Sequence, residues 1–170
     1  MPYNGRIMLA LVLAASLATS TEDYNATRQT GNNIGLGVLG AWALASTVTG
    51  SIGLATTNDP TWQGAHIANI AWGVINIGFA VVGLYLGLRP GATREDRAGA
   101  LADGQNTQFT YSWNAALDVG YIAASALAFT GFKDSRIHGF AAGSMVQALW
   151  LLAFDSVMAL FHMINNERLR

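Results

Sequence analysis

Four long apolar stretches, separated by polar breaks, dominate the sequence: residues 34–55, 64–88, 109–129 and 137–164. Each is long enough to supply the roughly 20 residues that an α-helix needs to cross the hydrocarbon core of a bilayer. The breaks contain residues that end helices, such as Pro60 and Pro90. The pattern predicts an all-α integral membrane bundle of four antiparallel transmembrane helices over residues 34–165.

The third stretch carries polar residues on one helical face. Asn114, Asp118, Tyr121 and Ser125 recur at i, i+4, i+7 and i+11. A carboxylate near the centre of a spanning helix costs roughly 2.5–3.5 kcal/mol on insertion scales. We therefore expect this face to turn away from lipid, toward the other helices.

The second and fourth stretches have matching stripes. In the second, helical spacing places these residues on one face: His66, Asn69, Gly73, Asn76 and Gly83. In the fourth, the stripe consists of Ser144, Gln147, Leu151, Asp155, Met158 and His162. The three stripes predict a bundle closed around a polar seam.

The first stretch has small residues instead, at every fourth position: Gly37, Ala41, Ala45, Thr49 and Gly53. Small-xxx-small patterns let membrane helices approach closely. This pattern predicts close helix contact along the whole segment.

The chain ends are polar or signal-like. Residues 1–20 resemble a secretory signal or a short anchor, because Arg6 precedes the apolar residues 7–17 and Ser16-Leu17-Ala18 resembles a cleavage site. Residues 21–33 read as a polar linker or an amphipathic surface segment, and residues 166–170 as a polar C-terminal tail.

Arginine and lysine residues bear on the orientation, because they favour the cytoplasmic side. With the loop 89–104 inside, the inside residues are Arg28, Arg89, Arg94, Arg97, Arg168 and Arg170, against Arg6, Lys133 and Arg136 outside. A cleaved signal would instead export residues 19–33. The sequence leaves both orientations open.

Composition excludes several function classes. The chain is 52% hydrophobic and 11% charged, and its net charge of −1 offers no basic surface for nucleic acid. It has no cysteine, hence no disulfide and no thiolate chemistry. Neither hydrolase, zinc-protease nor phosphate-loop motifs occur. No catalytic residue is predicted, and the protein is expected not to be an enzyme.

The two aspartates within spans are the strongest functional candidates. Asp118 and Asp155 are expected at similar depth, where two carboxyl groups close together would share a proton. Three roles stay open: a structural hydrogen-bond network, passage of protons or ions, or a ligand pocket. The predicted network or binding residues are His66, Asn69, Asn76, Asn114, Asp118, Tyr121, Gln147, Asp155 and His162.

The histidines do not predict a metal site. His66 begins the second span and His162 ends the fourth, so they are expected at opposite membrane faces, about 30 Å apart in depth at 1.5 Å per residue. His138 could pair with His66 but falls near a turn. No metal is predicted, and the cofactor is unassigned.

Several of these motifs together resemble an uncharacterised family of small bacterial membrane proteins with a signal-like N-terminus. The motifs are His66-x-x-Asn69-x-x-Trp72-x-x-x-Asn76, Asn114-x-x-x-Asp118-x-x-Tyr121, and Gln147 with Phe154-Asp155 and His162. Residues 40–45 are similar to the family's Gly-Ala-Trp-Ala-Leu-Ala segment, whereas Gly73 departs from the pattern, which has Asn there. The resemblance covers residues 33–165 and implies a fold but no activity.

We predict a non-catalytic structural or accessory subunit of a larger membrane complex. The alternatives are a small proton or ion transporter component using Asp118 and Asp155, and an intramembrane protein that binds a small molecule or cofactor. The expected partners are the lipid bilayer and other membrane subunits or a second copy. The expected location is the bacterial inner membrane.

Overall fold

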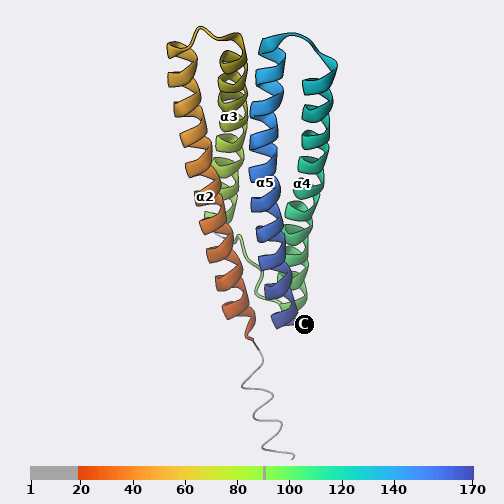
Figure 1. Cartoon of the computed structure of the whole chain (residues 1–170). Helices are drawn as coiled ribbons and strands as arrows, with labels where there is room; N and C mark the ends of the chain where they lie inside the picture. Colours follow the sequence, from red (N-terminus) through yellow and green to blue (C-terminus); the bar gives the residue numbers. More distant parts are fainter. Residues whose placement is uncertain (1–18, 90) are drawn as a thin grey trace, which may run out of the picture.

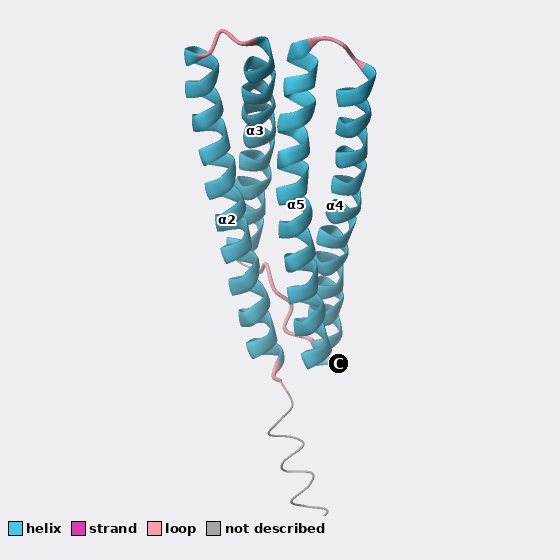
Figure 2. Ribbon diagram, in the orientation of Figure 1, coloured by secondary structure: helices cyan, strands magenta, loops and turns pink. Residues whose placement is uncertain are grey.

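The computed structural model describes residues 19–89 and 91–170, which form four helices without strands (Figures 1 and 2). These are α2 (Thr21–Thr56), α3 (Pro60–Leu88), α4 (Arg97–Gly131) and α5 (Ser135–Leu169). The predicted all-α fold of four helices is confirmed. Three of them, α2, α3 and α5, are long and apolar enough to cross a membrane. The predicted signal-like or anchor segment lies outside the described residues except for its last two.

The helices run up and down between two ends of the bundle. The α2–α3 and α4–α5 connections lie at one end, and the α3–α4 connection lies at the other, with the start of α2 and the C-terminus (Figure 1). Helix α5 packs mainly against α3 and α4, and α2 packs mainly against α3. Helix α5 therefore packs between α3 and α4, and α3 packs between α2 and α5.

The predicted polar linker 21–33 is instead the beginning of α2, so that prediction is wrong. Ser20 caps the helix by accepting a hydrogen bond from the Asp23 backbone N–H at 3.0 Å. The segment is polar because it packs against other polar groups. Fully buried Tyr24 donates from its hydroxyl to Asn166 Oδ1 at 2.6 Å. The predicted C-terminal tail is likewise helical through Leu169, which is buried.

Aspartates begin the other three helices. Asp59 precedes Pro60 and accepts from two backbone N–H groups of α3, and Asp134 does the same for α5. Asp96 accepts from the Gly99 N–H at 2.7 Å. This cap starts α4 at Arg97, twelve residues before the apolar stretch that begins at residue 109. The sequence pattern placed these twelve residues in a loop.

Glycines bring α3 and α5 into backbone contact near the α2–α3 connection. A Cβ atom on Gly64 would overlap the Arg136 carbonyl oxygen, and one on Gly139 would overlap the Thr61 carbonyl oxygen. Farther along, a Cβ atom on Gly143 would lie 2.9 Å from the Ala65 carbonyl oxygen. Close backbone approach at small residues is a common way for membrane helices to pack.

We predict that Gly139→Ala destabilises the bundle, because its methyl group has to push α3 away from α5. Overpacking of this kind costs about 1–3 kcal/mol. Gly78→Ala in α3 is the matched control, since its methyl group would meet open space. Thermal unfolding of both purified variants should show a lower midpoint for Gly139→Ala only. Equal midpoints would show that the two helices are not held at this distance.

Candidate functional site

A cavity of about 890 Å³ lies between α3 and α4. These two helices are the pair whose Cα atoms nowhere come within 8 Å of each other in the described residues. One side-chain contact bridges them: the rings of Trp72 and Tyr121 meet edge-on, with 4.9 Å between centroids. Residues of α2 and α5 line the rest of the cavity wall. Its volume falls within the roughly 300–1,000 Å³ typical of small-molecule sites.

Most of the cavity wall is apolar. The apolar lining side chains come from all four helices and include Leu36, Leu39, Ile75, Phe79, Leu117, Leu151 and Phe154. Water is poorly held by such walls. The cavity is therefore shaped for a predominantly apolar occupant.

A polar stripe of α4 runs along this cavity. The predicted face of α4, from Asn114 through Asp118 and Tyr121 to Ser125, lines it entirely. The stripe continues toward the start of α4 through Asn106, Thr107 and Thr110, which the sequence analysis left out. Their three- and four-residue spacing continues the same helical face. That regular spacing was the signal that could have found them.

The two aspartates meet at the cavity wall. Asp118 of α4 and Asp155 of α5 are 3% and 5% exposed, and both line the cavity. Their carboxyl groups lie next to each other, and Asn114 lies beside Asp155. Oδ2 of Asp118 has no hydrogen-bond partner. The cavity therefore contains a carboxyl pair with one unused acceptor.

Asn76 adds an unused donor. Its side chain is 4% exposed and lines the cavity from α3, and its Nδ2 atom has no hydrogen-bond partner. Buried polar groups without partners are rare and costly, by about 1–3 kcal/mol each. Both side chains line the cavity, but Asn76 Nδ2 and Asp118 Oδ2 themselves are enclosed by protein atoms.

Gln147 belongs to a different, self-contained network. Its Oε1 accepts from Trp42 Nε1 at 2.8 Å, and its Nε2 donates to Asn69 Oδ1 at 2.9 Å and to Ser46 Oγ at 3.2 Å. The Trp42 ring stacks on Trp150, with centroids 4.6 Å apart. Gln147 does not line the cavity. This network ties α2, α3 and α5 together and needs no ligand.

The histidines lie away from the cavity lining and at opposite ends of the bundle. His66 packs against Gly53 near the α2–α3 connection. His162, near the C-terminus, is fully buried and stacks on Tyr111, with 5.5 Å between centroids. His138 contacts Phe129 and the Phe132 carbonyl oxygen in the turn before α5. His66 and His138 therefore share one end of the bundle, and His162 lies at the other, as the sequence predicted for His66 and His162 (Figure 1).

The small-residue stripe of α2 faces outward over most of its length, against the expectation of contact within the bundle. Gly37, Ala41, Ala45 and Thr49 are exposed, and a Cβ atom on Gly37 would meet nothing within 4 Å. Only Gly53 touches α3, through His66. Each four-residue step turns the stripe by about 40° around the helix, because a turn takes 3.6 residues.

The inward face of α2 follows a different spacing. Three- and four-residue steps keep its buried residues on one side of the helix: Leu36, Leu39, Ala43, Ser46 and Gly50. A Cβ atom on Gly50 would lie 2.9 Å from the His66 carbonyl oxygen. The close contact between α2 and α3 thus uses small residues, but not those of the predicted stripe.

The fold and the cavity define a class: a four-helix bundle with three helices apolar enough to cross a membrane and with buried polar groups around an internal cavity. Residues 38–156 match the Family of unknown function (DUF6992), which is well over half of the 170 residues, so the chain belongs to this family. This confirms membership of an uncharacterised family. No curated protein and no solved structure matches the chain.

We predict that Gln147→Leu and Asp118→Leu differ in stability. Gln147→Leu leaves Trp42, Ser46 and Asn69 without their partner, which should lower the free energy of unfolding by about 1–3 kcal/mol. Asp118→Leu removes an oxygen that has no partner, and should change the free energy of unfolding by less than about 1 kcal/mol. Unfolding of both variants in detergent compares them directly. A larger loss for Asp118→Leu would make the aspartate a structural residue.

Proposed function

We propose that the protein is an integral membrane protein whose four helices are antiparallel spans. Three helices have the length and apolarity for this, and large hydrophobic side chains cover their outer faces, for example Ile52, Val82 and Val157. Helix α4 is less apolar because its polar stripe faces the cavity. A polar face of this kind is expected in a membrane only where it is turned from lipid.

Within the membrane, the protein is a non-catalytic binding protein for a small organic molecule held between α3 and α4. One observation carries this proposal: a mostly apolar cavity of about 890 Å³ is lined on one side by the polar stripe of α4, with Asn76 of α3 and Asp118 of α4 among its lining residues. The expected ligand is mostly apolar and has an acceptor for the amide and a donor for the carboxylate. A hydroxyl group fulfils both functions.

The cavity walls favour an organic ligand over an ion. A path for protons or ions needs polar groups or water along its whole length. Here the polar stripe ends at Ser125, and the lining beyond it consists of residues such as Ala128, Phe140 and Ala141. The cavity is partly open to the outside, which would also give a lipid-soluble molecule a route from the bilayer.

A second function, association with another membrane helix, is favoured by the outward stripe of α2. Gly37, Ala41 and Ala45 form an exposed strip on which a second backbone could approach closely. The partner that this proposal takes is a second copy of the chain. Such a contact would agree with an accessory role in a larger complex.

The ligand proposal predicts that Ala124→Trp expels the bound molecule. Ala124 lines the cavity, whereas neighbouring Ala123 does not, so Ala123→Trp is the matched control. We expect native mass spectrometry of protein purified gently from membranes to find a small molecule on the wild type and on Ala123→Trp. Its occupancy on Ala124→Trp should fall about tenfold, since overpacking costs about 1–3 kcal/mol. Equal occupancy of both variants, or an empty wild type, would contradict the proposal.

The association proposal predicts disulfide crosslinking through α2. The natural chain has no cysteine, so a single introduced cysteine reports one position. Ala45→Cys should give a covalent dimer on mild oxidation in membranes, because close backbones bring Cβ atoms within about 4.5 Å. Leu44→Cys, which is also exposed but rotated by about 100° around the helix, should not. Equal crosslinking at both positions would indicate random collision.

A further inference from the structure

A second pocket, of about 390 Å³, lies at the end of the bundle that contains the α3–α4 connection. Three arginines line it: Arg28 from α2, and Arg89 and Arg94 from the connection. Asp103 of α4 is the one acidic residue in the lining. The pocket therefore carries more positive than negative charge.

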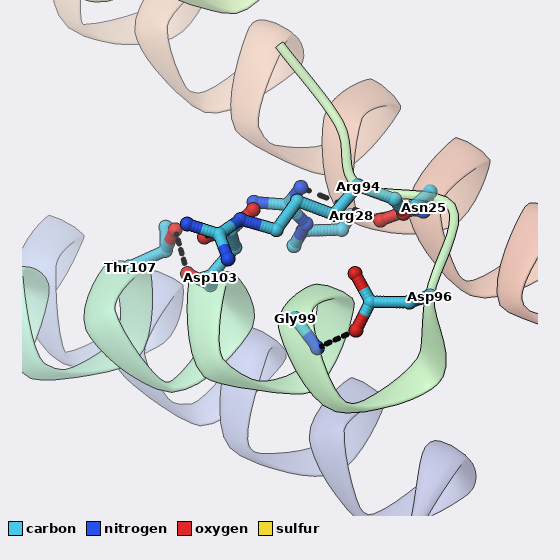
Figure 3. Close-up of polar contacts among 7 residues, drawn as sticks. All are labelled: Asn25, Arg28, Arg94, Asp96, Gly99, Asp103 and Thr107. Carbon is cyan, nitrogen blue, oxygen red and sulfur yellow. Dashed lines mark hydrogen bonds and ion pairs between the residues drawn. The ribbon is translucent and has the colours of Figure 1, made fainter. Parts of the chain in front are cut away.

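Hydrogen bonds hold the arginines in place. Asn25, which is 8% exposed, donates through Nδ2 to the Arg94 carbonyl oxygen at 2.8 Å and accepts from Arg28 at 3.4 Å. Figure 3 shows Arg28 and Arg94 beside each other over the first turns of α4, near Asp103 and Thr107. The α3–α4 connection is thus fastened to α2 through the Arg94 backbone, and the Arg28 guanidinium group contacts Asn25.

The acidic residue does not neutralise this pocket. Arg94 Nε lies 3.6 Å from Asp103 Oδ1, a pair that accounts for one of the three positive charges. Arg28 Nε is buried and has no hydrogen-bond partner. A guanidinium group presents a planar set of donors that matches phosphate in two-point contacts. Because Arg28 Nε is itself enclosed by protein atoms, an anionic oxygen in the pocket would be bound by the terminal nitrogens of the arginine side chains.

The arginine pocket adjoins the cavity between α3 and α4. Asn106 and Thr107 line both. From Thr107 to Asp118 is eleven residues of α4, or about 16 Å along the helix at 1.5 Å per residue. That is close to half of the roughly 30 Å hydrocarbon core of a bilayer. One elongated molecule can therefore reach from the pocket, at the membrane surface, to the acid pair near the midplane.

We propose that the pocket of Arg28, Arg89 and Arg94 binds a phosphate group, and that this phosphate is the headgroup of an anionic lipid whose chain lies in the α3–α4 cavity. The inference rests on the proposed ligand-binding function and adds the class of ligand. The same end carries Arg97, Arg168 and Arg170. Arginine-rich ends favour the cytoplasmic leaflet, where anionic lipids are found.

The test compares two lipids with identical acyl chains. Delipidated full-length protein in neutral detergent is titrated with phosphatidylglycerol and with phosphatidylcholine, and tryptophan fluorescence reports occupancy, because Trp72 lines the cavity. We expect phosphatidylglycerol to bind about tenfold more tightly than phosphatidylcholine, as expected for charge-assisted hydrogen bonds. Arg28→Gln should reduce this preference, because it should weaken phosphatidylglycerol more than phosphatidylcholine, whose phosphate is already compensated by choline. Arg89→Gln serves as a second variant if Arg28→Gln fails to fold.

Arg97→Gln is the matched control, because it removes the same charge at the same end but does not line the pocket. The preference of Arg97→Gln for phosphatidylglycerol over phosphatidylcholine should stay within about threefold of that of the wild type. A change of about threefold is what a general surface-charge effect produces. An equal preference in Arg97→Gln and Arg28→Gln would overturn the inference. So would equal binding of both lipids, although the ligand-binding cavity would then stand.

Inorganic phosphate separates the two sources of the anion. If phosphate alone binds in an Arg28-dependent manner and neither lipid does, the phosphate site is supported, its natural occupant is a soluble phosphate, and the lipid-filled cavity is rejected. Binding of neither lipid nor phosphate would overturn the inference outright. Ala124→Trp, which fills the cavity without touching the arginines, should weaken both lipids and leave phosphate binding unchanged.

Discussion

The close approach of α3 and α5 at glycine is the constraint on which the rest of the bundle depends. Gly64 and Gly139 leave no space for a Cβ atom between these backbones, so α3 is fixed to one face of α5. Helix α4 packs on another face of α5. Since both neighbours of α5 are fixed in this way, α3 and α4 stay apart, and the space between them becomes the cavity. The Trp72–Tyr121 contact bridges this space without closing it.

Some buried polar groups in this bundle have hydrogen-bond partners for all their polar atoms, and others do not. Gln147 is 2% exposed, and both its donor and its acceptor are used by neighbouring helices. Asn76 and Asp118 are as deeply buried, yet each keeps a polar atom without a partner. A fold gains nothing from such an atom, because burial without a hydrogen bond costs free energy. A structural network residue such as Gln147 therefore differs from the cavity-lining residues Asn76 and Asp118 in its hydrogen-bond partners and not in its burial.

The sequence predicted the helices and their inward faces better than it predicted their ends. Helical periodicity is a property of each segment alone, which is why the polar stripe of α5 from Ser144 to His162 proves entirely buried. The starts of α2 and α4 depend on capping by Ser20 and Asp96 and on burial of polar residues such as Tyr24 by other helices. Hydrophobicity does not report such tertiary contacts. For the same reason, hydrophobicity did not distinguish Gln147, whose donor and acceptor both have partners, from Asp118, which keeps an oxygen without one.

The polar residues of α4 explain both why this helix contains no stretch as apolar as those of the other three and what lines the proposed binding site. From Asp103 through Thr107, Thr110 and Asn114 to Asp118, one helical face carries polar groups that line first the arginine pocket and then the cavity. These residues lower the apolarity of α4 as a span, which is unfavourable unless that face is covered. Beyond Ser125 the lining turns to Ala128, Phe140 and Ala141. The polarity thus decreases from a charged mouth to an apolar end, which is the gradient of an amphiphile inserted head outward.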